Sequence, residues 1–548
     1  MKADTRSHLE YREAGWWRDE TFLDDLRRYV ADRPRKTAVA GRLAATGKTE
    51  TIDYAELSRL TDSVARGLVD LGIRPGEYIG IQLPDYWEML PLTLGCIQAG
   101  VRIAPLPPEY RRSELEHMFR LTGARLFITV TELHGGRPAE VATELARELR
   151  LPEQVAVIGD DVPAGALSFR EHFLADRGRP EGGPEAGRLE AGHAGRRLDP
   201  DEPFLILFTS GTTGENKAAL HSQNTLYAGI QGYAEALGLK DTLVTTTPHT
   251  SMHYVGLVTR LLTSLVLGGT AVCADVWDPA VTLGLIEQYG VTLFYGSPPY
   301  VRELLAAQRV RARDTSSLAC IVSGSAPVPP QLLEEVRESL GVRMFSLWGM
   351  SENGAVTVTR PDDPQDWAAH SDGRPTRGMR VRIDPMPGRT DGGGSLWVRG
   401  PMQCLGYYKR DEAYAADLDE NGWFNTGDLA RDDGRHGIRI VGRSKDIIIY
   451  RSANVPVADI EAVLGKHPKV RDVALIGIPD PAVDERVCAV VTAAGDSLPT
   501  LDELRDYLRD AGISSWCWPE RLEVIEAMPR TPLGKIRKAD LRKRYPAM

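Results

Sequence analysis

The sequence predicts an α/β protein with a large N-terminal domain and a small C-terminal α+β domain. Three observations support this prediction. Amphipathic helical stretches alternate with short apolar runs over residues 17–175 and again over 204–361, the pattern of β-α-β units with a largely parallel sheet. Residues 373–432 instead contain short strands and turns, which indicates a β-rich subdomain. Alternation returns over residues 447–548, consistent with a compact lid domain.

Each expected element follows from its local pattern. We expect helices where apolar residues recur every three or four positions, and strands where a short apolar run is bounded by Gly or Pro. The expected helices are residues 22–30, 54–71 and 501–510. The expected strands are residues 78–82, 124–130, 204–208, 243–246, 270–273, 293–295, 319–322, 473–478, 487–492 and 522–525. Residues 176–200, rich in Gly, Pro, Glu and Arg, are expected to form a surface excursion.

The composition is typical of soluble globular proteins. Of the 548 residues, 42% are hydrophobic and 26% charged, and the net charge of −10 argues against a nucleic-acid partner. The six cysteines form no C-x-x-C pair, so neither a disulfide framework nor a zinc site is expected. The N-terminal residues lack the apolar core of a signal peptide, and no apolar run is long enough to span a membrane. We therefore expect a cytoplasmic protein without a membrane partner, and leave its oligomeric state open.

The most informative segment is residues 205–217, LILFTSGTTGENK. An apolar strand runs into a loop whose glycines permit close approach of a ligand, and whose hydroxyls and backbone N–H groups can donate to an anion. The Walker A spacing is not present. A hydroxyl-rich surface loop is the alternative, but the preceding strand and Lys217 behind it favour a phosphate-binding loop. Its residues are Thr209, Ser210, Gly211, Thr212, Thr213 and Gly214.

Five motifs in order resemble those of the adenylate-forming superfamily, which contains acyl- and aryl-CoA synthetases, adenylation domains and beetle luciferases. The phosphate loop is the first. The others are LWGMSE at 347–352, which resembles the aromatic-Gly-x-Thr-Glu element, GWFNTGD at 422–428, GRSKD at 442–446 and PRTPLGK at 529–535. Residues 11–17 look most like those of cyclohexanecarboxylate-type acid ligases.

The resemblance implies a domain plan and a reaction. Residues 1–441 would form the N-terminal adenylation domain, residues 442–446 the hinge, and residues 447–548 a mobile lid that rotates about Lys445. An acid oxyanion would attack the α-phosphorus of ATP and expel pyrophosphate, so catalysis would consist mainly of positioning and of neutralising phosphate charge. The acyl adenylate would then pass to a second nucleophile, with CoA as the family default.

The resemblance also assigns roles by position. Glu352 would bind Mg²⁺, a hard cation that prefers oxygen ligands. Asp428 would accept hydrogen bonds from both ribose hydroxyls, Arg443 would assist at the ribose or phosphate, and Lys535 would bridge the attacking oxygen and the α-phosphate. Thr209 and Lys445 complete the expected catalytic set. Further nucleotide contacts are expected from the phosphate loop, Lys217, Trp348, Gly349 and Ser351.

The acid pocket is the least determined part of the expected site. The residues expected to line it are His253, Ser323, Gly324, Ser346 and Gly349, and none carries a decisive charge, so the acid stays open. Structural alternatives exist: Glu352 as a helix cap, Asp428 in an Asx-turn, Lys535 in a basic tail and His253 as a buried structural histidine.

The sequence departs from the family pattern after the hinge. Arg451 and Ser452 replace two glycines of the usual D-x-I-x-x-G-G-x-N run. In thioester-forming members the second glycine lies beside the pantetheine tunnel, where the lack of a side chain allows close approach. The acceptor is therefore left open between CoA, a carrier protein and an amine, including the case of ATP-dependent diazotases, which resemble this family and activate nitrite for an aromatic amine. A non-catalytic nucleotide-binding protein is disfavoured because Glu352, Asp428 and Lys535 are all retained.

Overall fold

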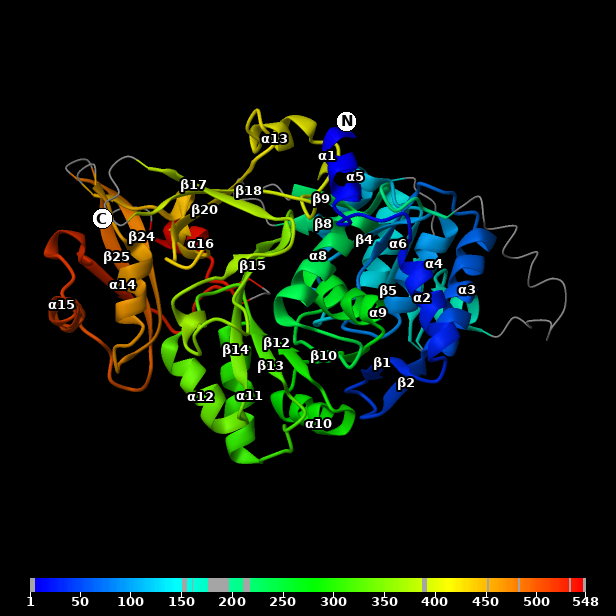
Figure 1. Cartoon of the computed structure of the whole chain (residues 1–548), viewed down its shortest axis with the longest axis horizontal. Helices are drawn as coiled ribbons and strands as arrows, with labels where there is room; N and C mark the ends of the chain where they lie inside the picture. Colours follow the sequence, from blue (N-terminus) through cyan, green and yellow to red (C-terminus); the bar gives the residue numbers. More distant parts are fainter. Residues whose placement is uncertain are drawn as a thin grey trace.

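The computed structural model describes residues 5–149, 155–159, 161–175, 197–209, 217–386, 392–450, 453–480, 483–531 and 534–545. In this part of the chain the strands form four sheets, with helices packed against them (Figure 1). The mixed α/β architecture confirms the predicted fold class.

The first sheet has the strand order β19-β9-β8-β4-β3-β5-β6-β7, and its central pairs are parallel. Its strands are β3 (Tyr78–Ile81), β4 (Arg102–Pro105), β5 (Leu126–Val130), β6 (Val155–Ile158), β7 (Leu167–Ser168), β8 (Pro203–Thr209), β9 (Lys217–Ser222) and β19 (Gly406–Tyr407). The helices of this region are α1 (Thr5–Glu13), α2 (Phe22–Asp32), α3 (Tyr54–Asp70), α4 (Met89–Ala99), α5 (Arg112–Thr122), α6 (Pro138–Glu148) and the π-helical turn η1 (Arg170–Leu174). The predicted β-α-β pattern is therefore confirmed here.

The second sheet has the order β16-β15-β14-β13-β12-β10-β11-β1-β2. Its strands are β1 (Thr37–Arg42), β2 (Thr49–Asp53), β10 (Val244–Thr246), β11 (Thr270–Ala274), β12 (Leu293–Tyr295), β13 (Cys320–Ser323), β14 (Arg343–Met350), β15 (Gly354–Val358) and β16 (Arg374–Pro375). Its helices are α8 (Gln223–Leu237), η2 (Val255–Leu262), α9 (Thr263–Leu267), α10 (Pro279–Tyr289), α11 (Pro298–Val310), α12 (Pro330–Leu340) and the short η3 (Trp367–Ala369). The strand β1 pairs in parallel with β11, so the N-terminal segment completes this second sheet.

The largest buried cluster joins the two sheets through α3 and α4. It contains Ile103 of the first sheet, Leu92 of α4 and Val39 of the second sheet. Helix α4 is apolar on almost all sides, which is why it can lie between two sheets rather than at the surface. The two sheets therefore share one core.

The β-rich subdomain is a four-stranded antiparallel sheet. Its order is β17 (Arg380–Pro385), β18 (Gly394–Arg399), β20 (Phe424–Asp432) and β21 (Ile438–Arg443), and α13 (Asp411–Ala416) lies between β19 and β20 in the sequence. This agrees with the prediction for residues 373–432. The turn η4 (Ser444–Asp446) follows β21 directly and carries the hinge motif.

The C-terminal part has its own sheet and core. It contains β22 (Ile449–Tyr450), β23 (Ala453–Asn454), β24 (Val470–Asp480), β25 (Asp484–Ala493), β26 (Arg521–Val524), α14 (Val457–Leu464), α15 (Leu501–Asp510), η5 (Ser515–Cys517) and α16 (Lys538–Arg544). Thr500 caps α15 by accepting from the N–H of Glu503, and Leu504 and Leu508 bury its apolar face. In Figure 1 this part lies beside β17 and β20, at the end of the molecule opposite α2 and α3.

Within the described residues, no helix combines the length and the apolar character needed to cross a membrane.

Candidate active site

Four neighbouring parallel strands, β10, β12, β13 and β14, bring the expected pocket residues to one edge of the second sheet. His253 follows β10, Ser323 ends β13 with Gly324 after it, and Ser346 and Gly349 belong to β14. Ligands of parallel sheets bind outside the carboxyl ends of the strands, so this edge is the natural place for a site. One expected pocket group is already occupied, since the Ser346 hydroxyl donates to Asp372 (3.2 Å).

The phosphate loop joins two antiparallel neighbours. Strand β8 ends at Thr209 and β9 begins at Lys217, and these two residues are paired across the strands. The loop between them therefore starts and ends at one place on the sheet. Its expected ligands Ser210, Gly211, Thr212, Thr213 and Gly214 lie outside the described residues.

Lys217 is held by two side chains that sequence reasoning missed. Its ammonium donates to the Asp417 carboxylate (2.6 Å) and to the Tyr407 hydroxyl (3.2 Å), and the Tyr407 hydroxyl donates to the same Asp417 oxygen (3.0 Å). Tyr407 lies on β19, which pairs with β9 beside Lys217. The register of β19 on β9 therefore brings these groups together.

Glu352 lies buried in the turn between β14 and β15. Burial raises the pKa of its carboxyl, and the nearby Lys217 and Arg443 act in the opposite direction. A hydrogen bond holds this turn in place, because the ring N–H at Nε2 of His221 donates to the Ser351 carbonyl (2.7 Å). Burial lowers the pKa of His221 to about 4, so this histidine is neutral near pH 7. Sequence reasoning missed His221.

Asp428 receives donors on both carboxylate oxygens. The indole N–H of Trp348 donates to Oδ2 (3.0 Å), and Nε of Arg443 contacts Oδ1 (2.8 Å). Asp428 and Arg443 are also direct partners across β20 and β21. Two elements of the site, from different sheets, are thereby joined through one buried carboxylate.

Lys535 reaches this cluster from the C-terminal part. Its pKa is lowered by burial and by Arg443, while Asp428 and Glu352 raise it, so all three motif residues lie within its electrostatic reach. The N–H of Lys535 donates to the Thr531 hydroxyl (3.1 Å), and Gly534 before it has φ +82°. A Cβ on Gly534 would lie 3.4 Å from the hydroxyl oxygen of Ser297, the residue that precedes α11. The loop that carries Lys535 is thus docked on the N-terminal domain.

The hinge motif lies directly beside the site. Ser444 follows Arg443 and donates from its hydroxyl to the Gly427 carbonyl (3.0 Å), while Asp446 accepts from Arg542 of α16 (2.7 Å). The backbone of Lys445 forms the middle of turn η4. Arg451 and Ser452 lie outside the described residues.

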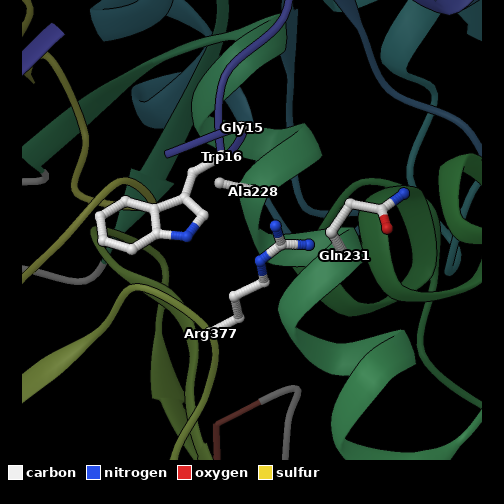
Figure 2. A pocket seen from close by; sticks show the side chains of 5 residues that line it. All are labelled: Gly15, Trp16, Ala228, Gln231 and Arg377. Carbon is white, nitrogen blue, oxygen red and sulfur yellow. The ribbon is translucent and has the colours of Figure 1, made fainter. Parts of the chain in front are cut away.

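Two shallow hollows are present in the described structure. One lies between the N-terminal segment, α8 and the loop before β17, and none of the five motifs contributes to its lining. Figure 2 shows Trp16, Ala228, Gln231 and Arg377 around this hollow. The other lies between α8, η2 and β15 and is lined in part by Gly229, Tyr254 and Ala355. Only the second adjoins the carboxyl edge of the second sheet.

Comparison with known proteins identifies the family. A family model described as AMP-binding enzyme matches residues 26–408, and a model described as AMP-binding enzyme C-terminal domain matches residues 459–535. The chain belongs to the AMP-binding enzyme family. It is an AMP-forming acid ligase that uses ATP, as we predicted from its resemblance to the adenylate-forming superfamily.

Relatives of this AMP-binding enzyme cover nearly its whole length. It is 29% identical over 539 residues to the medium-chain fatty-acid–CoA ligase of Escherichia coli K12 (97% of this chain, 92% of the relative). It is 32% identical over 540 residues to triostin synthetase I of Streptomyces triostinicus (97% and 96%). The solved structure of amide bond synthetase McbA from Marinactinospora thermotolerans is similar with a TM-score of 0.81 and 27% identity (96% and 100%).

The contact between Trp348 and Asp428 can be tested by mutation. Trp348→Phe removes the N–H that orients the carboxylate and should raise the KM for ATP about tenfold, the value of one hydrogen bond to a charged group. Because a ground-state contact is lost, kcat should change much less. Asp428→Ala should raise the KM for ATP further. Steady-state pyrophosphate release measures both.

The matched control is Trp397→Phe in the same subdomain, because the buried indole N–H of Trp397 has no hydrogen-bond partner. An equal rise in KM for the Trp397 and Trp348 variants would contradict the assignment, as would a Trp348 variant whose kcat alone falls.

Proposed function

We propose that this ligase adenylates a small acid with release of pyrophosphate and then transfers the acyl group to a second nucleophile, CoA being the first candidate. The observation that carries the proposal is the arrangement of Lys535 beside Glu352 and Asp428. Groups from both halves of the chain meet there, as a reaction that depends on neutralising phosphate charge requires.

The adenylation step assigns a role to each member of the cluster. The carboxylate oxygen of the acid forms a bond to the α-phosphorus, and the bond from that phosphorus to the bridging oxygen breaks, so pyrophosphate leaves. Lys535 would bind the attacking oxygen and the α-phosphate. Asp428 would bind the ribose hydroxyls with Trp348 and Arg443 orienting it.

The charges in the site fit Mg²⁺. The described part of the site contains three carboxylates and three cations that interact with one another. The carboxylates are Asp417, Asp428 and Glu352, and the cations are Lys217, Arg443 and Lys535. A triphosphate adds negative charge to this balanced set, so its entry is favoured with a divalent cation, and the buried Glu352 carboxylate is the oxygen ligand in place to hold it. The bound ion would stabilise the charge that develops on the phosphate oxygens.

The transfer step needs the second domain to move. In the proposal, residues 1–441 remain fixed, residues 442–446 act as the hinge with Lys445 in its middle, and residues 447–548 carry Lys535 away. The nucleophile then attacks the acyl carbon, the bond from that carbon to the phosphate oxygen breaks, and AMP leaves while the nucleophile loses its proton. The phosphate loop with Thr209 and Lys217 would hold the leaving phosphates in the first step.

An amine is the second candidate acceptor. Arg451 and Ser452 replace glycines at the expected pantetheine tunnel, where side chains would hinder CoA. Similarity to the amide bond synthetase McbA supports the same branch. This branch includes activation of nitrite for reaction with an aromatic amine, as in the ATP-dependent diazotases that resemble this family.

Lys535→Ala should lower the rate of pyrophosphate release about 100-fold, because a contact made in the transition state is worth on the order of 3 kcal/mol. The affinity for ATP should change little. The variant Lys538→Ala, three positions further on and paired with Glu461 (2.7 Å), is the matched control.

The same lysine predicts a pH effect. Since burial lowers its pKa, the protonated form should be lost, and activity with it, at a pH below that of an ordinary lysine. Lys535→Arg keeps the charge and should move this decline to higher pH. A wild-type rate of pyrophosphate release that stays constant through pH 10.5 would contradict this role of Lys535 in adenylation. Normal pyrophosphate release by the Lys535→Ala variant would contradict it as well.

The acceptor is determined by comparing pyrophosphate and AMP release from the wild type given ATP and a good acid. Without an acceptor, we expect about one equivalent of pyrophosphate and bound adenylate. Rapid AMP release on adding CoA supports the first candidate, and release only on adding an amine, or nitrite with an arylamine, supports the second. Arg451→Gly with Ser452→Gly should raise the CoA-dependent rate only if these side chains hinder CoA. Failure of every nucleophile to accelerate AMP release would overturn both.

A further inference from the structure

Two histidines in the segment that follows β10 have ring nitrogens without hydrogen-bond partners. His249 is 3% exposed, and neither its Nε2 nor that of the nearby His253 has a hydrogen-bond partner. His249 was not among the pocket residues expected from the sequence. The fully buried hydroxyl of Ser323, at the end of β13, also has no partner.

Both imidazoles are neutral near pH 7. Burial lowers the pKa of His249 to about 3, with His253 and Arg260 adding to the effect, and lowers that of His253 to about 4. A neutral imidazole offers one donor and one acceptor. An unpaired buried nitrogen is unfavourable, so a ligand that supplies a hydroxyl or an amino group gains free energy here that a plain hydrocarbon does not.

The charged groups near these histidines are already paired. Arg260, almost fully buried, donates to both carboxylate oxygens of Asp85 and to the Ser251 hydroxyl (2.7 Å), which itself donates to Asp85 (2.8 Å). The loops that directly follow β10, β12 and β13 contain no lysine or arginine. A second carboxylate on the substrate would therefore meet no free cation among these described loops.

The walls of this region are aromatic rings. His249 lies edge-on to Tyr295 (centroids 5.6 Å apart) and to Tyr300 (5.3 Å), and Tyr300 lies edge-on to Trp277 (5.2 Å). Such rings favour a flat aromatic partner, which packs with edge-to-face or offset contacts.

The side chain next to His253 in the sequence is tightly packed. Tyr254 follows His253, and a Cβ on Gly229 or on Gly354 would lie 2.5 Å from its hydroxyl oxygen. The Tyr254 ring is therefore held between two backbone segments, and it is one of the residues that line the hollow between α8, η2 and β15.

We propose that the acid is an aromatic monocarboxylic acid with a hydroxyl or amino group on its ring, and that His249 and His253 bind that group. The inference rests on the proposed adenylation function and specifies its substrate. The carboxylate lies toward Lys535 and the ring lies against Tyr295 and Tyr300.

The test is acid-dependent ATP–pyrophosphate exchange by the full-length wild type. The panel contains benzoate, the three hydroxybenzoates, the three aminobenzoates, octanoate, malonate and nitrite. We expect at least one hydroxy- or aminobenzoate to exceed benzoate, octanoate, malonate and nitrite by about tenfold or more in kcat/KM, because a site built around a hydrogen bond rejects the analogue that lacks it.

Variants then test the two histidines. His249→Phe and His253→Phe should each lower kcat/KM for the substituted benzoate about tenfold, while kcat/KM for benzoate changes little. The ratio of the two kcat/KM values should therefore fall. The exposed His370→Phe is the matched control. Thermal unfolding of each variant checks folding.

The outcomes are distinct. A preference for octanoate, malonate or nitrite, or equal rates for benzoate and all its substituted forms, overturns this inference while adenylation stands. The inference is also overturned if both histidine variants fold and lose kcat/KM equally for every acid. If none of the acids supports ATP–pyrophosphate exchange, the proposed function itself is overturned.

Discussion

The Asp428 carboxylate interacts with three parts of the chain that are distant in sequence. Trp348 comes from the second sheet, Arg443 from the end of β21, and Lys535, within electrostatic reach, from the C-terminal part. A buried carboxylate is costly unless both oxygens have strong donors, and here they do. Because Asp428 and Arg443 are partners across β20 and β21, the sheet register keeps this arrangement in place.

The position of Lys535 against the N-terminal part depends on the same balance of charge. Lys535 loses hydration when its loop docks against Ser297, and the carboxylates of Asp428 and Glu352 offset that loss. At the opposite side of the site, Lys217 is balanced by Asp417. Each of these two cations therefore lies near at least one carboxylate of the protein itself.

The sequence predicted the elements and the motifs but not the long-range contacts between them. The strand at Leu293–Tyr295 and the helix at Leu501–Asp510 have the predicted limits, because local apolar patterns determine such elements. The contact of Tyr407 and Asp417 with Lys217 depends on the register of β19 on β9, for which no local pattern exists. His249 was not among the expected pocket residues, because its contact with the ring of Tyr295 arises only when β10 and β12 pair as neighbours.

The central claim is that the arrangement with Lys535 beside Asp428 and Glu352 is the one in which the adenylate forms. Ser297→Cys with Gly534→Cys should allow a disulfide that holds this arrangement, at the cost of backbone strain at position 534 (φ +82°), since a Cβ there lies 3.4 Å from the side-chain oxygen at 297 and all six native cysteines are buried. After oxidation in the presence of ATP, the account predicts about one equivalent of pyrophosphate on adding the acid and no transfer to the nucleophile until the disulfide is reduced. An oxidised protein that releases no pyrophosphate, while the reduced protein turns over normally, would contradict it.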